Sequence, residues 1–210
     1  MALQTKSRDE VFEAIDKYNV RFVRIWFTDI LGVPKSFAIN PRELDGAFSE
    51  GMGFDGSSIE GFARIHESDM VAKPDPTTFQ LIPWRQQEHA VARMFCDIQN
   101  PDGSPYEGDP RYVLKRNLER IKDKDYSFQV GPELEFFYFK NEHCTEGLDS
   151  GGYFDLTTAD NASDLRRDTI LALDSATDTG TVIDLRESWA KVARISGDPL
   201  ALSVSETPQS

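Results

Sequence analysis

Two glutamates, Glu133 and Glu135, have the residue type and spacing in this sequence that best suit chemistry. They stand two positions apart in an apolar stretch, residues 131–137 (Gly-Pro-Glu-Leu-Glu-Phe-Phe). Side chains alternate between the two faces of a β-strand, so both carboxylates project from the same face. Two ionised carboxylates on a buried face repel each other and lose hydration. A hard divalent cation with oxygen ligands would neutralise them, and the pair is therefore our candidate metal site.

The alternative is the solvated face of an amphipathic strand, because Glu-x-Glu is a common pattern. The neighbouring residues favour the metal site instead. Phe137 and Phe139 would share the face of the two glutamates, where a solvated strand carries more polar residues. The preceding Gly131-Pro132 pair also fixes how the chain enters the strand.

A second group of candidate residues lies in a glycine-rich loop, residues 53–58 (Gly-Phe-Asp-Gly-Ser-Ser). Glycine permits backbone conformations that let such a loop close over a small polar ligand. The carboxylate of Asp55 would attract a small cation such as ammonium. A structural turn explains the same residues equally well. A phosphate-binding loop is excluded, because the Gly-x-x-x-x-Gly-Lys-Ser/Thr pattern is absent.

Composition and charge limit the class of protein. The chain has 210 residues and a formal net charge of −13, which argues against binding to nucleic acid or to anionic membranes. No apolar run of about 18 residues predicts a membrane span, and residues 1–8 lack the apolar core of a secretion signal. Cys96 and Cys144 lack metal-type spacing, and we interpret them as free thiols. We therefore expect a cytoplasmic protein.

The elements that must position these residues fall into two domains of an α+β fold. The pattern of residues 1–100 predicts a small mixed sheet. Its helices would begin at a Ser7–Glu10 capping box and at Pro41, the second ending near Ser49. Its strands would cover residues 21–27, 35–39, 70–72, 79–82 and 91–97. The first two strands would form a hairpin, and residues 51–61 would be a loop.

The second half begins after a linker at residues 101–108, which is rich in Asn, Pro, Asp and Gly. A partial domain, residues 109–173, would open with a helix capped by Asp109. In that helix Leu114, Leu118 and Ile121 predict a stripe facing the core. Strands would follow at residues 126–130 and 133–140, and then a helix from Asn161 or Ser163 to about residue 173. Residues 174–210 would form a divergent, disordered tail.

Three segments, in this order, resemble glutamine synthetase: residues 54–59 (Phe-Asp-Gly-Ser-Ser-Ile), 131–137 and 151–155 (Gly-Gly-Tyr-Phe-Asp). Supporting matches lie at residues 24–29, 67–70 and 92–97, so that the resemblance covers about residues 10–173. It implies a β-grasp-like amino-terminal domain followed by the start of a glutamine-synthetase-type α/β catalytic domain.

The resemblance also implies an activity and its site. In this family ATP phosphorylates the side-chain carboxylate of glutamate, and ammonia attacks the γ-glutamyl phosphate. By position, Glu133 resembles a ligand of the Mg²⁺ or Mn²⁺ ion that clamps the ATP phosphates, and Glu135 a ligand of the ion that holds glutamate. Asp55 resembles the aspartate that binds and deprotonates ammonium from a neighbouring subunit of an oligomer. Ser58 shares its loop, and Tyr153 resembles a tyrosine of the ammonium pocket. The residues that contact ATP are not identified.

The sequence departs from the family after the last predicted helix. The family continues there with a His-His-Glu segment that completes the metal sites, whereas His143 is the last histidine of this chain. We therefore expect a truncated chain that is inactive alone. Two other functions stay open: a γ-glutamyl-amine ligase, and a non-catalytic subunit that assembles with or regulates a full-length glutamine synthetase.

Overall fold

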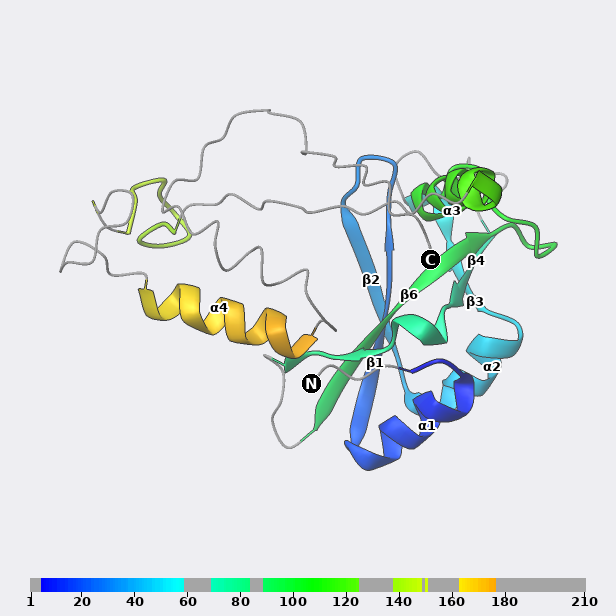
Figure 1. The fold of residues 1–210 in the computed structure, drawn as a ribbon, viewed down its shortest axis with the longest axis horizontal. Coiled ribbons are helices and arrows are strands. Elements are labelled where there is room, and N and C mark those ends of the chain that lie inside the picture. Colours follow the sequence, from blue (N-terminus) through cyan, green and yellow to red (C-terminus); the bar gives the residue numbers. More distant parts are fainter. Residues whose placement is uncertain are drawn as a thin grey trace. The chain divides into compact units, whose positions relative to one another are not determined.

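The computed structural model describes residues 5–58, 69–83, 89–124, 138–148, 150 and 163–176 (Figure 1). They belong to two compact units, the first spanning Leu3–Tyr126 and the second containing Ser127–Ser210. The strand predicted at residues 126–130, most of the one at 133–140 and the tail beyond residue 176 lie outside the described residues. None of the described helices is long and apolar enough to cross a bilayer.

The first unit is built on a mixed sheet. Its strands are β1 (Val20–Thr28), β2 (Pro34–Ile39), β3 (Met52–Asp55), β4 (Asp69–Pro74), β5 (Gln80–Leu81) and β6 (Ala90–Gln99). Their order is β2-β1-β6-β4-β3, with β5 paired to β6. Strands β1 and β6 are parallel and the other pairs are antiparallel, which confirms the predicted mixed sheet and the β1–β2 hairpin. Strands β1, β6 and β3 therefore run in one direction, and their carboxyl ends lie at the same end of the sheet.

The helices of this unit begin where the sequence predicts caps. Helix α1 (Arg8–Lys17) follows Ser7, whose hydroxyl accepts a hydrogen bond from the N–H of Glu10. The 3-10 turn η1 (Pro41–Glu43) and helix α2 (Leu44–Ser49) follow Asn40. There the Asn40 side chain accepts from the N–H of Arg42, and the Glu43 carboxylate accepts from the N–H of Asn40. Each cap satisfies a backbone donor that the helix itself leaves unpaired.

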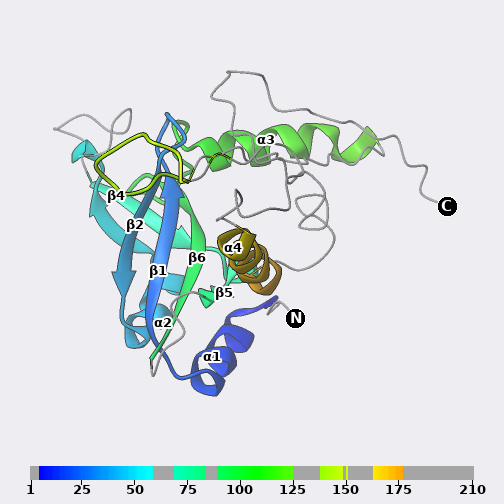
Figure 2. The same cartoon turned by 90° about the vertical axis from the view of Figure 1, so that its left-hand side faces the viewer.

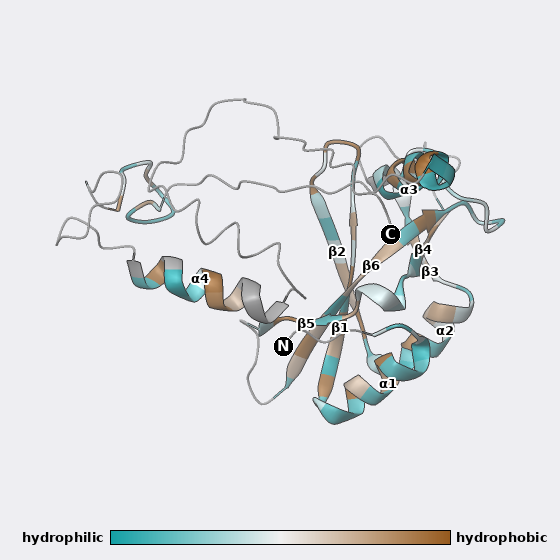
Figure 3. Ribbon diagram, in the orientation of Figure 1, coloured by the Kyte–Doolittle hydropathy of each residue, from teal (hydrophilic) through white to brown (hydrophobic). Residues whose placement is uncertain are grey.

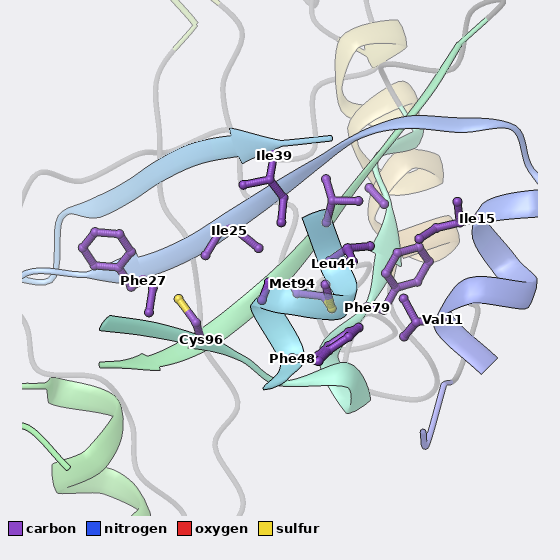
Figure 4. Packing of buried hydrophobic residues seen from close by; sticks show 14 of the residues in the cluster. Val11, Ile15, Ile25, Phe27, Ile39, Leu44, Phe48, Phe79, Met94 and Cys96 are labelled. Atoms are coloured by element: carbon purple, nitrogen blue, oxygen red, sulfur yellow. The ribbon is translucent and has the colours of Figure 1, made fainter. Parts of the chain in front are cut away.

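The core lies between one face of the sheet and helices α1 and α2 (Figure 4). Alternate residues of each strand face this core, so the strands carry both hydrophobic and hydrophilic residues (Figure 3). The largest fully buried side chains include Phe79, Ile25, Leu44, Met94, Ile98, Val11 and Val23. Cys96 is also buried, and burial raises the pKa of its thiol, whereas Cys144 is partly exposed. Both are free, as the sequence predicts.

Contacts between side chains on its two edges show that the sheet is curled. The ring of Phe54, on edge strand β3, lies 5.1 Å from the ring of Phe27 on β1 and 6.3 Å from that of Phe37 on the other edge strand, β2. Rings of Phe27 and Phe37 lie 6.5 Å apart. These three aromatic side chains close the open side of the sheet around a shared apolar centre.

The prediction of a loop over residues 51–61 is wrong for residues 52–55, which form β3. Pairing with β4 overrides the low strand preference of glycine. Gly51 makes the approach possible: its φ is +86°, and a Cβ atom there would lie 2.3 Å from Cγ1 of Val71. A side chain would therefore clash with β4 at this position. Residues 59–61 of the predicted loop lie outside the described residues.

The predicted core stripe of the next helix is also wrong. Helix α3 (Pro110–Ile121) lies across one end of the sheet (Figure 2), yet the side chains of Leu114 and Leu118 are 52% and 39% exposed. The polar side of α3 contacts β6 instead: Nε of Arg111 donates to Asp97 at 3.0 Å, and Nζ of Lys115 donates to it at 2.6 Å. Charge pairing therefore sets the orientation of α3, which apolar periodicity alone does not reveal.

A buried carboxylate joins α3 to the sheet. Asp109 is 1% exposed, and its Oδ2 accepts a hydrogen bond from the N–H of Ile98 at 3.0 Å. Its Oδ1 caps α3 by accepting from the N–H of Arg111 at 3.0 Å. Burial raises the pKa of Asp109, against the opposing effect of these two donors. The preceding residues 100–108 form an ordered turn, in which the N–H of Asn100 donates to the carbonyl of Ser104 at 2.8 Å.

The described part of the second unit consists of a small β-bridge and a helix. Phe139 pairs with Gly147, and the N–H of Leu148 donates to the carbonyl of Tyr138 at 2.8 Å. Helix α4 (Ser163–Ala176) confirms the predicted helix, but it extends past residue 173, so the prediction of a disordered tail is wrong for residues 174–176. The alternative start at Asn161 lies outside the described residues. The hydroxyl of Tyr138 lies 3.5 Å from that of Thr169 on α4, which links the bridge to the helix.

We predict that Asp109→Ala lowers the free energy of unfolding by about 2 kcal/mol, because it removes a helix cap and leaves the buried N–H of Ile98 without its acceptor. Chemical denaturation followed by circular dichroism measures this change. Asp102→Ala is the matched control: Asp102 also caps a turn but is exposed, so its loss should cost less than about 1 kcal/mol. Equal losses in the two variants would contradict the anchoring role of Asp109.

Candidate functional site

The candidate site lies at the carboxyl end of β3, where strand pairing and aromatic packing position Asp55. Phe54 directs its ring into the cluster with Phe27 and Phe37, and the alternation of the strand turns Asp55 the other way, toward solvent. The 3-10 turn η2 (Gly56–Ser58) follows at once, so that Ser58 belongs to the same turn. The packing of Phe54 thus fixes the place of the adjacent carboxylate.

One oxygen of the Asp55 carboxylate is held by Ser57. Oδ1 accepts the N–H of Ser57 at 2.9 Å and its hydroxyl at 2.6 Å. The hydroxyl and then the N–H lower the pKa of Asp55, since both hydrogen bonds favour the charged form. Within the described residues, no group donates a hydrogen bond to Oδ2. Asp55 therefore presents an ionised oxygen to solvent at neutral pH.

A second carboxylate stands opposite the first. Asp55 pairs in register with Asp69 on the antiparallel strand β4, and both residues are exposed. Side chains of directly paired residues project from the same face of a sheet, and like charges in such a pair repel each other. The end of the β3–β4 pair therefore carries two negative charges.

The hairpin between β1 and β2 ends at the same end of the sheet as Asp55. Its turn is organised by Asp29, whose side chain is 2% exposed and whose Oδ1 accepts the N–H groups of Leu31 and Val33 at 2.9 and 2.8 Å. Burial alone would raise the pKa of Asp29, but these donors and Lys35 lower it. The turn displays three apolar side chains: Ile30, Leu31 and Val33 are 51%, 64% and 46% exposed.

The structure places only part of the predicted site. Asp55 and Ser58 lie together in one turn, whereas Glu133, Glu135 and Tyr153 lie outside the described residues. Among the residues that the structure does describe, no cluster of three or more His, Cys, Asp or Glu side chains could hold a metal ion. Sequence reasoning did not single out Ser57, which holds the Asp55 carboxylate, or Asp69, which pairs with Asp55 in register. The Asp-x-Ser spacing was a signal for the first, but the strand register that pairs Asp69 with Asp55 has no local signal.

A cavity of about 600 Å³ lies elsewhere in the same unit, between the end of β6 and α3. Its walls include Ile98, Pro105, Tyr112 and Arg116. It contains none of the site residues predicted from the sequence, and both of its carboxylates are already paired: Asp97 with Lys115 and Arg111, and Glu119 with Lys122. The Asp55 turn therefore remains the candidate site.

Comparison with protein families identifies two matches that divide the chain. Residues 19–101 match the family described as "Glutamine synthetase, beta-Grasp domain", and residues 107–184 match "Glutamine synthetase, catalytic domain". The chain is 51% identical over 175 residues to the glutamine synthetase of Mycolicibacterium smegmatis and 49% identical over 172 residues to that of Methanosarcina mazei. Each alignment covers 80% of this chain but 39% and 38% of the relatives. The chain thus spans about two fifths of their length.

Solved structures of related proteins share the fold. A structure described as "GmaS/ADP complex" has a TM-score of 0.62 and 26% identity, and the match covers 76% of this chain and 36% of that protein. The Plasmodium falciparum glutamine synthetase has a TM-score of 0.61 at 20% identity, covering 80% of this chain and 40% of that protein. The second likeness supports the fold alone.

We predict that Phe54→Ala lowers the free energy of unfolding by about 2 kcal/mol, less than for a fully buried phenylalanine, because the ring of Phe54 is only partly buried. Thermal or denaturant unfolding measures the loss. Phe22→Ala provides the control: Phe22 lies on β1 but is 53% exposed, and its substitution should change stability by less than about 0.5 kcal/mol. If the two variants unfold alike, the aromatic cluster does not hold the edges of the sheet together.

Proposed function

Because this chain belongs to the glutamine synthetase family, we propose that it serves the ATP-dependent ligation of ammonia to glutamate through γ-glutamyl phosphate. The observation that carries the proposal is the Asp55 turn. It combines an exposed carboxylate of lowered pKa, one oxygen that no described residue engages, and a second carboxylate in register with it. These are the properties that a binding site for a small cation requires.

The proposed reaction has two steps. In the first, an oxygen of the glutamate side-chain carboxylate attacks the γ-phosphorus of ATP, the bond to the bridging oxygen breaks, and ADP leaves. In the second, ammonium bound to Asp55 loses a proton, and the nitrogen lone pair attacks the acyl carbon. The carbon–oxygen bond to the phosphoryl group then breaks, and the positively charged nitrogen passes its second proton to the departing phosphate, which leaves glutamine. The role of Asp55 is to bind the cation and to accept its first proton, which frees the lone pair for the attack.

Glu133 and Glu135 would hold Mg²⁺ or Mn²⁺, because two carboxylates on one strand face offer the oxygen donors that hard divalent cations prefer. Bound ions would supply neutralisation of the charge on the phosphate oxygens during phosphoryl transfer. Tyr153 is proposed to line the ammonium pocket, and Ser58 to stand beside Asp55. The support for these four residues is the sequence pattern.

Asp55 is proposed to act in the site of a neighbouring subunit, in a homo-oligomer or in a hetero-oligomer with a full-length relative. The apolar turn of the β1–β2 hairpin supports this arrangement, since Ile30, Leu31 and Val33 are exposed at the end of the sheet that carries Asp55. Exposed apolar residues that a buried carboxylate holds in place suit contact with another protein surface.

Two free thiols fit a reducing, cytoplasmic location.

The proposal predicts complementation between two proteins. A full-length glutamine synthetase, such as that of Mycolicibacterium smegmatis, would carry Asn at the aspartate that aligns with Asp55. Mixing it with this chain should restore phosphate release that depends on ATP, glutamate and ammonium. The variant Asp55→Asn should restore about a hundredfold less, the scale of a lost acid–base group. Asp102→Asn, at an exposed turn of the same type, should restore as much as the unchanged chain.

Three outcomes of this assay would contradict the proposal. Equal restoration by the Asp55→Asn chain would remove Asp55 from the site. Faster phosphate release with methylamine than with ammonium would identify a γ-glutamyl-amine ligase. Assembly with the full-length protein without any ammonium-dependent effect would identify a non-catalytic subunit. The chain assayed alone, with each amine, completes the comparison.

The metal assignment predicts that Glu135→Ala weakens Mn²⁺ binding by about tenfold or more, because even residues that only support a metal ligand change affinity on that scale. Isothermal titration calorimetry of the full chain with MnCl₂ measures the affinity. Glu119→Ala, which removes an exposed carboxylate from α3, should leave it unchanged. Unchanged affinity in the Glu135 variant would show that the glutamate pair faces solvent.

A further inference from the structure

We propose that Ser57 is a positioning residue, which holds the carboxylate of Asp55 so that Oδ2 alone faces the bound cation. The identity of the cation as ammonium rests on the proposed function; the positioning itself does not. Both hydrogen bonds from Ser57, at 2.9 Å from its N–H and 2.6 Å from its hydroxyl, end on Oδ1. Two donors on one oxygen fix the rotation of the carboxylate and occupy that oxygen.

The described residues contain the same turn twice more, and one of these copies shows what its second oxygen does. Oδ1 of Asp75 accepts the N–H and hydroxyl of Thr77 at 3.0 and 2.6 Å. Its Oδ2 forms an ion pair with the guanidinium of Arg111. In this turn a Ser or Thr at the third position therefore occupies Oδ1 and leaves Oδ2 directed toward a cation. At Asp55 the same geometry occurs without such a cation from the described residues.

The third copy, at Asp102, shows the effect of the turn without a paired carboxylate. Oδ1 of Asp102 accepts the N–H and hydroxyl of Ser104 at 2.9 and 2.6 Å, in an exposed turn between β6 and α3. Its pKa is lowered, as that of Asp55 is, first by the Ser104 hydroxyl and then by the N–H. Asp102 lacks the register partner that distinguishes Asp55, whose opposite residue on β4 is Asp69. The turn alone therefore orients a carboxylate, and the paired strand adds the second negative charge.

The consequence for the ligand is geometric. With Oδ1 occupied, Asp55 can offer one oxygen to a cation and cannot form the two parallel hydrogen bonds that a guanidinium makes with a free carboxylate. A compact ammonium group needs only one acceptor oxygen from each neighbour. Losing the Ser57 hydroxyl would leave Oδ1 with a single donor, so the carboxylate could rotate. The charge-assisted hydrogen bond between Oδ2 and ammonium would then weaken. The binding of ammonium should then suffer more than the later chemical step.

The test compares Ser57→Ala with Ser57→Thr in the full chain. Carboxyl ¹³C NMR titration of Asp55 should show its pKa raised toward the ordinary aspartate value in the Ala variant, and unchanged in the Thr variant, because Thr77 already makes both hydrogen bonds at Asp75. Ser104→Ala is the matched control. It should raise the pKa of Asp102 and leave that of Asp55 as it was.

The second measurement is the complementation assay described above. Ser57→Ala should raise the KM for ammonium by about tenfold, the effect of a charge-assisted hydrogen bond, with a much smaller change in kcat. Ser57→Thr should restore the original KM, and Ser104→Ala should not alter it. A purely structural role of Ser57 would lower the unfolding temperature without separating KM from kcat.

The outcomes separate this inference from the proposed function. If Asp55→Asn abolishes complementation while Ser57→Ala changes neither the pKa of Asp55 nor the KM, the positioning role is overturned and the function stands. If Ser57→Ala raises the pKa but the unchanged chain never complements, the orientation of Asp55 stands and the ligase function falls. Failure of Ser57→Thr to restore the pKa would contradict the equivalence with the Asp75 turn.

Discussion

The contact between the two edges of the curled sheet is the constraint on which the rest of the first unit depends. Phe54 reaches across from β3 to Phe27 and Phe37, although the strand order separates β3 from β2 by three other strands. Without this contact β3 would be a strand of four residues that is held by β4 alone. With it, the last residue of β3 has a fixed place, and that residue is Asp55. Apolar packing thus supplies the precision that a polar site needs.

Carboxylates organise the turns of this acidic chain. Asp29 shapes the β1–β2 turn and Asp109 ties α3 to β6. In three Asp-x-Ser/Thr turns among the described residues, one carboxylate oxygen accepts two donors. Most of these groups have lowered pKa values, so their hydrogen bonds stabilise the fold at neutral pH and are lost as acidification protonates them. Asp109 is the exception, because burial raises its pKa. The excess of negative charge is therefore partly structural.

Local sequence signals predicted most of the elements, but they failed where contacts with residues far along the chain determine the structure. The cap at Ser7, the helix start at Pro41 and the strand of residues 21–27 depend on neighbours in the chain, and the structure confirms them. Strand β3 was missed because its stability comes from β4, and glycine has a low strand preference. The stripe at Leu114 and Leu118 was misplaced because ion pairs orient α3. For the site, the sequence located Asp55 and Ser58, but only the register of β3 with β4 shows that Asp69 stands opposite.

The lowered pKa of Asp55 affects the balance between cation binding and proton removal in such a site. A carboxylate stabilised in its charged form binds a cation well but removes a proton poorly, since its conjugate acid is strong. Because ammonium has no lone pair, a proton must leave before the nitrogen can attack, and its transfer to a carboxylate of lowered pKa is uphill; the attack that follows would consume the ammonia and draw this transfer forward. In that arrangement the Ser57 hydrogen bonds favour binding over basicity, and the reactive acyl phosphate has to supply the driving force. The turn would then act chiefly as a cation holder, and the small fraction of ammonia that it releases would be trapped by the acyl phosphate.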